Sequence, residues 1–459
     1  MNNLDPTKLF AMSETRSVRR NRSKQARLSV PLKEHSIWRP GDAKRNTVRM
    51  IQRSNEGRIP ELIPVRHGRM LPTPFTYYRG SAVVMAADLS KTPTSGFVVQ
   101  ACGDCHIQNF GAFATPERNV ILDLNDFDET LPAPWEWDVK RLAASLVLAA
   151  QANGLSDDFG GDCAYRTARQ YREYMLELSE LPRLARWYSR LDFNEFAESL
   201  DDSVVRDTLK RSLKEAKSKS SSEYLLGKLT EDSFGVKKFC DKPPTLFHLP
   251  KATDEETLRD FNDYVSTLPD DRRVFLSPYA VVDVAIKAVG IGSVGTRCGV
   301  VLLSTSDNDL LVLQLKEAKA SVLEAYAGKS LYSHHGQRVV NGQRLMQASS
   351  DMFLGWYTSC RSNSDYYVRQ LRDVKVPVDT SSWNKQAFKE LAPVTGKILA
   401  RAHSRSGDVV TISAYLGKSD EFEIAISKFA TLYAKQIEQD YEKFVKACKR
   451  AELLYQERL

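Results

Sequence analysis

The sequence predicts an α+β fold with a helix-rich larger part. Two β-rich stretches, 97–101 and 119–124, lie close together early in the chain, and a second pair, 299–303 and 310–316, follows in the second half. Apolar residues in most of the remaining chain recur at helical spacing, which is typical of amphipathic and buried helices. The chain has 459 residues, of which 42% are hydrophobic, so it can bury a sizeable core.

The composition excludes some classes of function. The formal net charge of +7 is mild for a chain of this length; it favours an anionic ligand but is not the dense basic stripe of a dedicated nucleic-acid binder. No apolar run reaches membrane-spanning length and none resembles a signal peptide, so we expect a cytoplasmic protein that does not enter membranes. Among seven cysteines only Cys102 and Cys105 have C-x-x-C spacing, and without a second such pair we expect reduced thiols rather than zinc.

The N-terminal residues 1–45 are polar and basic, with five arginines between positions 16 and 27. We expect a solvated, flexible tail. The alternative is a segment that contacts an acidic partner, and a nucleic acid would be one such partner, although the mild net charge does not favour it.

The first half of the chain is expected to place a turn between two strands. The strand at 97–101 leads into Gly103 and Asp104, and a turn at 115–118 precedes the strand at 119–124. The apolar run at 139–152 predicts a buried helix. Residues 155–275 are expected to be mostly helical, with a mobile Lys/Ser-rich connection at 209–222.

The second half begins with an apolar run at 281–289 that leads into a glycine-rich segment. Two strands follow, 299–303 and 310–316, with a polar turn at 304–309. From residue 335 onward helices are expected to dominate, ending in a charged amphipathic helix at about 419–457.

Polar residues after the first two strands suggest a site for phosphates. Asp104 lies in the first turn, with Asn109 five residues later, and Asp126 and Asp128 follow the second strand. Clustered carboxylates are costly unless a cation shares them, and Mg²⁺ prefers carboxylates together with phosphate oxygens. Taken singly, each segment fits a hydrogen-bonded turn or a solvated acidic loop; together they predict a magnesium site.

The glycine-rich segment suggests a cover for those phosphates. Gly290, Gly292, Ser293 and Gly295 precede a strand, whereas the dinucleotide-binding version of this pattern opens a helix. The second strand after the glycines, 310–316, carries Lys316, and a glycine hairpin followed by a strand lysine is the kinase pattern, in which backbone amides and an ammonium hold phosphates. The alternative for the lysine is an exposed strand position.

Two charged residues complete the predicted site. Arg79 follows an aromatic cluster, and it either binds phosphate or stacks on its neighbours. Glu324 is our choice for the acidic partner of Lys316.

The quoted residues carry a resemblance to aminoglycoside phosphotransferase-type kinases. Gly103-Asp104-x-His106-x-x-Asn109 resembles their catalytic loop, and Asp126-Phe127-Asp128 resembles their metal-binding segment. The resemblance implies that Asp104 is the catalytic base, that Asn109 and Asp126 bind the metal, and that Asp128 assists.

The same resemblance extends to a helix start and includes one departure. The run 137–143 is similar to the later helix start in these kinases and implies that Asp138 braces the catalytic loop. Cys102 stands where those kinases usually carry His, so the bracing of the loop is in question.

In ordinary kinases the glycine loop and the lysine come before the catalytic Asp, whereas here the glycine segment and Lys316 come after Asp104. We therefore expect a kinase-like two-lobed fold that is circularly permuted, which is possible when the original termini lie close together. The ammonium of Lys316 should then lie within a nucleotide's length of Asp126. The expected division is a flexible basic tail (1–45), a catalytic-loop and metal half with a helical extension (46–275), a glycine-loop and lysine sheet lobe (276–350) and a helical C-terminal region (351–459).

The wider chain resembles a bacterial domain-of-unknown-function family, DUF2252, over about residues 45–440. The resemblance is carried by Pro74-Phe75-x-x-x-Arg79-Gly80, the segment from Gly103 to Gly111, Lys316-Glu317-Ala318 and Gly336-Gln337-Arg338. This family name implies no activity.

The function that these features predict is an ATP- and Mg²⁺-dependent phosphotransferase acting on a small-molecule or protein acceptor. The alternatives are a non-catalytic nucleotide-binding module of pseudokinase type and a transferase of AMP. The sequence defines neither the acceptor nor the oligomeric state.

Overall fold

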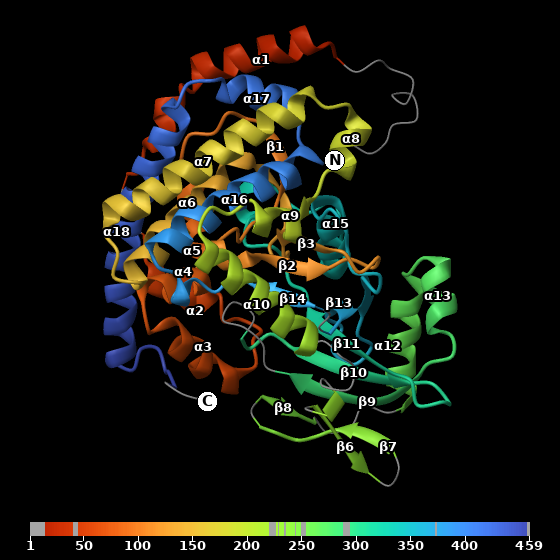
Figure 1. The fold of residues 1–459 in the computed structure, drawn as a ribbon. Helices are drawn as coiled ribbons and strands as arrows, with labels where there is room; N and C mark the ends of the chain where they lie inside the picture. The colour runs from red at the N-terminus through yellow and green to blue at the C-terminus, as the bar shows by residue number, and fades with distance from the viewer. Residues whose placement is uncertain are drawn as a thin grey trace.

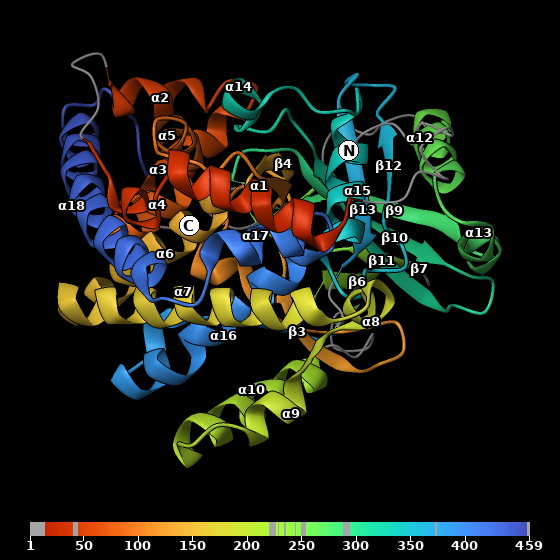
Figure 2. The ribbon, with the colours of Figure 1, turned by 90° about the horizontal axis from the view of Figure 1, so that it is seen from above.

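The computed structural model describes residues 14–39, 45–219, 226–227, 229–233, 236–243, 245–248, 254–287, 294–371 and 374–456. The expected α+β class is confirmed, with 54% of the structure helical and 16% in strands. Helices gather at one end of the molecule and an antiparallel sheet forms the other end (Figures 1 and 2). Within the described ranges, no helix is both long and apolar enough to cross a membrane.

Helix α6 (Trp135–Ala152) is the centre of the helical end, because nearly all of its side chains are buried. It packs against α7 (Asp157–Glu180), α16 (Lys385–Ser404) and α18 (Glu421–Lys449). Other helices cover this core: α1 (Arg16–Ser29), α2 (Thr47–Arg53), α3 (Ile63–Met70), α4 (Pro74–Gly80), α5 (Ala82–Leu89) and α17 (Val409–Leu416). Helix α8 (Arg183–Tyr188) follows α7 in the chain, and α9 (Phe193–Glu198) and α10 (Ser203–Lys219) pack on strands of the four-stranded sheet described next.

Two small antiparallel sheets lie against these helices. One pairs β1 (Val98–Ala101) with β4 (Leu131–Pro134). The other has the strand order β14 (Lys375–Pro377), β2 (Phe110–Ala114), β3 (Val120–Leu124) and β5 (Leu191–Asp192). The turn that follows β1 and the loop that follows β3 are the two segments that carry the predicted Asp104 and Asp126.

The larger sheet has six antiparallel strands. Their order is β12 (Gly355–Thr358), β13 (Asp365–Gln370), β11 (Leu310–Glu317), β10 (Cys298–Ser304), β9 (Ala280–Lys287) and β8 (Leu246–Phe247). Helix α15 (His335–Met346) packs on β12 and β13. The remaining described α-helices and strands are α12 (Asp254–Ser266), α13 (Asp270–Leu276), α14 (Glu324–Ala327) and the hairpin β6 (Thr230–Ser233) and β7 (Val236–Phe239).

The basic N-terminal segment is not a free tail over its described part. Helix α1 packs on α17, and the Arg27 guanidinium donates to the Tyr415 carbonyl oxygen (2.8 Å) at the end of that helix. Arg19 pairs with Asp408 at the other end (3.2 Å). Cations stabilise helix C-termini because the last carbonyls lack partners. Arg27 and Arg19, which suggested a solvated tail, therefore hold α1 against the two ends of α17.

One other expectation was wrong. Residues 209–219 of the expected mobile connection belong to helix α10, where Leu213 is buried. From residue 335 onward helices dominate as expected, with α15, α16, α17 and α18, although the short strands β12 to β14 lie between α15 and α16. These strands were not expected, because short runs give a weak period-two signal.

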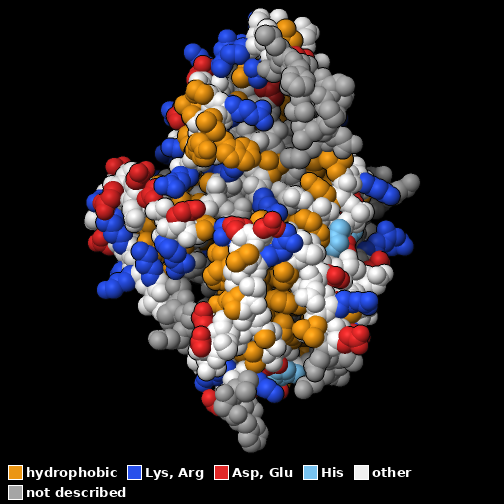
Figure 3. Space-filling view, turned by 90° about the vertical axis from the view of Figure 1, so that its right-hand side faces the viewer, with side chains coloured by type: hydrophobic (Ala, Val, Ile, Leu, Met, Phe, Trp, Pro, Cys, Tyr) orange, Lys and Arg blue, Asp and Glu red, His pale blue; other side chains and the backbone are white. Residues whose placement is uncertain are grey.

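Figure 3 shows how charged side chains are distributed on one face of the molecule. Lys and Arg side chains on it are interspersed with Asp and Glu and form no continuous basic stripe. This arrangement does not favour binding of a nucleic acid to that face.

Candidate functional site

The turn after β1 is held by the carboxylate of Asp138 in the first turn of α6. One carboxylate oxygen accepts from the Cys102 backbone N–H (2.6 Å) and the other from the Gly103 N–H (3.0 Å). His403 Nε2 lies 3.1 Å from the same carboxylate, and Tyr171 bonds to the other nitrogen of that ring (2.9 Å). The buried helix α6 therefore fixes the backbone of the turn.

Gly103 is required by the shape of this turn. Its φ is +86°, a region that favours glycine. A Cβ atom added at this position would lie 2.3 Å from the Glu129 carbonyl oxygen. The turn after β1 therefore packs directly on the loop after β3, which brings the Asp104 segment and the Asp126 segment together.

Asp104 points toward a buried arginine that the sequence reasoning did not assign a role. Arg141 Nε donates to Asp104 Oδ1 at 2.6 Å, and its guanidinium lies over the Tyr78 ring, 4.3 Å from the centroid. Burial raises the pKa of Asp104, and the positive charge of Arg141 opposes that rise. Arg141 lies three residues after Asp138 on α6, so the shared helical face was the available signal.

The second oxygen of Asp104 lies near His106, whose Nε2 is 4.0 Å away. Burial holds the pKa of His106 well below its usual value. The imidazole is therefore neutral at physiological pH, so His106 adds no full positive charge beside the Asp104 carboxylate.

Asn109 and Cys102 link the two loops. The Asn109 side-chain amide donates to the Asp104 carbonyl oxygen, and the Asn109 carbonyl accepts from the Asn125 N–H (2.8 Å). The Cys102 thiol donates to the Asp126 carbonyl oxygen at 3.2 Å. The cysteine that departs from the kinase pattern thus still connects the Asp104 turn to the Asp126 loop.

Lys316 on β11 reaches this loop across 188 residues of sequence. Its Nζ donates to Asp128 Oδ2 at 2.7 Å, and the Tyr367 hydroxyl donates to Oδ1 at 2.7 Å. Burial would raise the pKa of Asp128, but the charge of Lys316 and these hydrogen bonds outweigh it and lower that pKa to about 2. The lysine is only 3% exposed, so the exposed-strand alternative does not hold.

The acidic partner chosen for Lys316 was wrong. Glu324 instead accepts from the Ser321 backbone N–H (3.3 Å), while Asp128 pairs with the lysine. The error has a simple cause. Glu324 was chosen because it is near Lys316 in sequence, whereas the ion pair joins β11 of the larger sheet to the loop between β3 and β4.

The Asp126 carboxylate makes fewer hydrogen bonds and ion pairs within the described ranges than the Asp128 carboxylate does. Its Oδ1 accepts from the Asp128 N–H at 3.1 Å, and it forms no ion pair within the described ranges. In the same part of the chain no three His, Cys, Asp or Glu side chains gather closely enough to hold a metal ion. Mg²⁺ is commonly held by one or two protein oxygens together with phosphate oxygens and water, and Asp126 and Asn109 are the residues here that could supply such oxygens.

Two further cations border the acidic loop and were missed. Arg338 on α15 donates to the carbonyl oxygens of Asp128 (2.8 Å) and Thr130 (2.6 Å). Arg369 on β13 is desolvated, which would lower its pKa, but Asp126 and Asp128 are among the charges that raise it. These cations offset the negative charge of the acidic loop.

Arg79 lies on the Asp104 side of the site. Its Nε is buried and has no hydrogen-bond partner within the described ranges. Burial lowers the pKa of Arg79, and the charges of Asp104 and Asp379 partly restore it. A buried guanidinium with an unused donor is a candidate ligand for an anionic group.

Of the glycine segment, only its last residues are described. Gly290, Gly292 and Ser293 lie outside the described residues. Cys298 pairs in register with Lys316, so the segment between β9 and β10 ends beside the ammonium. Gly295 has a φ of +86°, and its carbonyl accepts from the Ile59 N–H (2.7 Å).

The Lys316–Asp128 pair predicts an acid-sensitive contribution to stability. A carboxyl whose pKa is depressed on folding stabilises the fold above its unfolded pKa of about 4, and here this contribution disappears as the pH falls toward 2. We expect Lys316→Met to lower the free energy of unfolding by about 1–2 kcal/mol near neutral pH, since Asp128 is 31% exposed and partly screened.

Urea unfolding of both proteins at a series of pH values measures this effect. The difference between them should shrink as the pH falls from about 4 to about 2, whereas the exposed-site control Lys329→Met should differ little from wild type throughout. A difference that stays constant across the window would contradict the pairing.

Comparison with known proteins adds a family and no activity. A family model described as an uncharacterised protein conserved in bacteria matches residues 58–447. No curated protein and no solved structure matches the chain.

Proposed function

The chain belongs to DUF2252, a family of uncharacterised bacterial proteins, and from its site we propose that it is an ATP- and Mg²⁺-dependent phosphotransferase with a two-lobed, kinase-like fold. The observation that carries the proposal is the contact of Lys316 with Asp128 at 2.7 Å. This contact joins a strand lysine to an acidic loop that packs on the Asp104 turn. Phosphoryl transfer needs such a set of groups: a positioned carboxylate, metal ligands and a cation for the phosphates.

A circular permutation explains the order of the segments. A kinase-like chain that is opened before β9 and whose own ends are joined runs from the glycine segment through Lys316 to Asp104. Such a rearrangement is tolerated where the chain termini lie close together on the surface.

The proposed roles follow from the positions of the side chains. Asp104 accepts the proton of an acceptor hydroxyl, whose oxygen forms a bond to the γ-phosphorus; the bond from that phosphorus to the bridging oxygen breaks, and ADP leaves with the electron pair. Asn109 and Asp126 would hold Mg²⁺, which neutralises phosphate charge when bound. Lys316 binds phosphate oxygens. The hydrogen bond from the Cys102 thiol to the Asp126 carbonyl oxygen holds the Asp104 turn against the Asp126 loop.

One observation favours the second candidate, a non-catalytic nucleotide-binding module. Arg141 holds Asp104 through an ion pair, which weakens the carboxylate as a base. The two candidates share nucleotide binding and differ in turnover, so turnover with varied acceptors distinguishes them. Transfer of AMP would use the same nucleotide site and release pyrophosphate, so analysis of the products separates it from phosphoryl transfer.

Binding of Mg-ATP is the direct test of the proposal. At a hundred times its dissociation constant, Mg-ATP should add about 2.7 kcal/mol to the free energy of unfolding, seen as a rise in Tm. Asp126→Asn removes the proposed metal ligand and should abolish most of that rise.

The control is Asp307→Asn, which removes an exposed carboxylate from the β10–β11 turn and should respond as wild type does. A Tm that is unchanged by Mg-ATP, or an equal response in Asp126→Asn, would overturn the proposal.

A further inference from the structure

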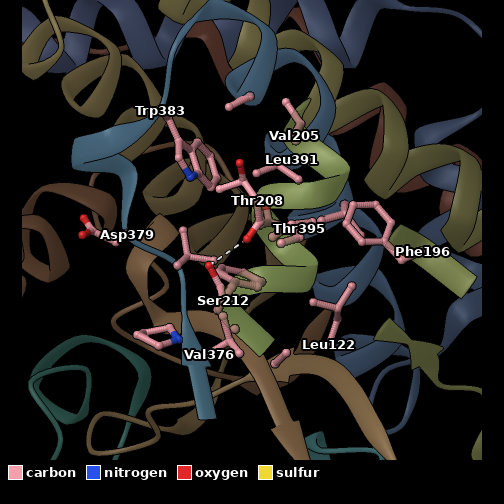
Figure 4. Close-up of a pocket in the computed structure, with 18 of the residues that line it drawn as sticks. Leu122, Phe196, Val205, Thr208, Ser212, Val376, Asp379, Trp383, Leu391 and Thr395 are labelled. Atoms are coloured by element: carbon pink, nitrogen blue, oxygen red, sulfur yellow. Dashed lines mark hydrogen bonds between the residues drawn. The ribbon is translucent and has the colours of Figure 1, made fainter. Parts of the chain in front are cut away.

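A cavity of about 200 Å³ lies on the helical side of the four-stranded sheet. Helices α10 and α16 and the strands β2, β3 and β14 surround it (Figure 4). Its walls are mainly apolar, with Phe196, Trp383 and Leu391 from the helical side and Leu122 and Val376 from the sheet.

The hydroxyl groups in the wall do not make the cavity polar. Ser212 donates to the Thr208 carbonyl oxygen (3.0 Å), and Thr395 donates to the Ala392 carbonyl oxygen (2.6 Å). Each is thus satisfied by its own helix. An apolar space of this size costs stability while it is empty, and an engineered cavity of about 150 Å³ in another protein binds benzene.

The cavity adjoins the Asp104 turn. Phe110, which lines it, directly follows Asn109, whose amide donates to the Asp104 carbonyl oxygen. On the other edge, Asp379 points away from the cavity centre (Figure 4) and acts on the same Arg79 guanidinium as Asp104 does. One wall of the cavity is therefore continuous with the loop that carries the proposed base.

We propose that this cavity binds the apolar body of the phosphoryl acceptor, a small alcohol with a single ring or a branched aliphatic group. This inference rests on the proposed function and names its substrate class. The volume accommodates one ring with a short side chain, and the satisfied hydroxyls of the wall offer little to a sugar or another polyol, which would lose hydrogen bonds to water on entry.

Binding is tested first, without nucleotide, on the full chain. Indole is the probe, and calorimetry measures its binding. Indole should bind wild type, and Ser212→Phe, which fills the cavity from α10, should weaken binding at least tenfold. Ser218→Phe on an exposed position of the same helix should bind as wild type does. Equal binding by both variants overturns the proposal.

Turnover is tested next with 2-phenylethanol and with glycerol as a polar control. 2-Phenylethanol should stimulate Mg-ATP turnover several-fold more than glycerol does, and Ser212→Phe should remove the difference while its Mg-ATP stabilisation stays intact, which shows that the variant folds. Indole binding without this selectivity overturns the acceptor assignment and leaves the nucleotide site standing. Indole binding without any Mg-ATP stabilisation overturns the proposed function and the acceptor role together.

Discussion

Asp104→Asn is expected to lower Mg-ATP turnover by about a hundred- to ten-thousand-fold, the usual contribution of a general base. The amide keeps the size of the side chain but cannot take a proton from the acceptor hydroxyl. Binding of Mg-ATP should change little, because Lys316 and Asp126 remain. Steady-state rates with 2-phenylethanol as acceptor, together with Mg-ATP-induced shifts in Tm, measure both effects.

The ion pair with Arg141 makes the control important. Asp104→Asn leaves a buried guanidinium with a weaker partner, and this alone can lower the stability. The variant Asp104→Asn/Arg141→Met removes both charges, so it should recover stability but not turnover. Unchanged turnover in Asp104→Asn with intact nucleotide binding would show that Asp104 is not the base, and wild-type binding of nucleotide without turnover of any acceptor would favour the non-catalytic module.

The segments that carry the candidate site could be predicted because their signals are local. A strand followed by Gly103 and Asp104 predicts a turn by itself, and β-rich residues before Asp126 predict a second strand beside it. Lys316 was recognisable because a glycine segment precedes the pair of strands whose second member ends in this lysine. In each case a few neighbouring residues determine the backbone, which is what propensity and periodicity report.

The partners of these residues could not be predicted in the same way. Asp128 pairs with a lysine 188 residues away, and no local pattern specifies which of several acids will meet it. Arg141 was visible as part of a helix, but its contact with Asp104 depends on how α6 packs beneath the turn. The basic run in α1 misled for a related reason, since Arg27 bonds carbonyls of α17 that are nearly 400 positions away.

A buried ion pair supports the strand before Asp126. Asp123 on β3 and Arg401 on α16 are both fully buried and bonded to each other. The carboxylate also accepts from the Ala348 N–H (2.8 Å), and the guanidinium donates to the Met346 carbonyl oxygen (2.8 Å). This network joins β3, α16 and the segment after α15, so it connects both ends of the molecule to the acidic loop.

Arg401→Met is therefore expected to lower the free energy of unfolding by about 3–5 kcal/mol, because it leaves the Asp123 carboxylate buried without its cation. Urea unfolding measures the loss, and Lys389→Met, at an exposed position of the same helix, should cost little. The double variant Arg401→Met/Asp123→Asn should lose less than the sum of the two single variants, since the second change removes the unpaired charge. Additive losses, or a cost below about 1 kcal/mol for Arg401→Met, would mean that hydrogen bonds to the backbone hold β3 in place and that the ion pair contributes little to positioning Asp126.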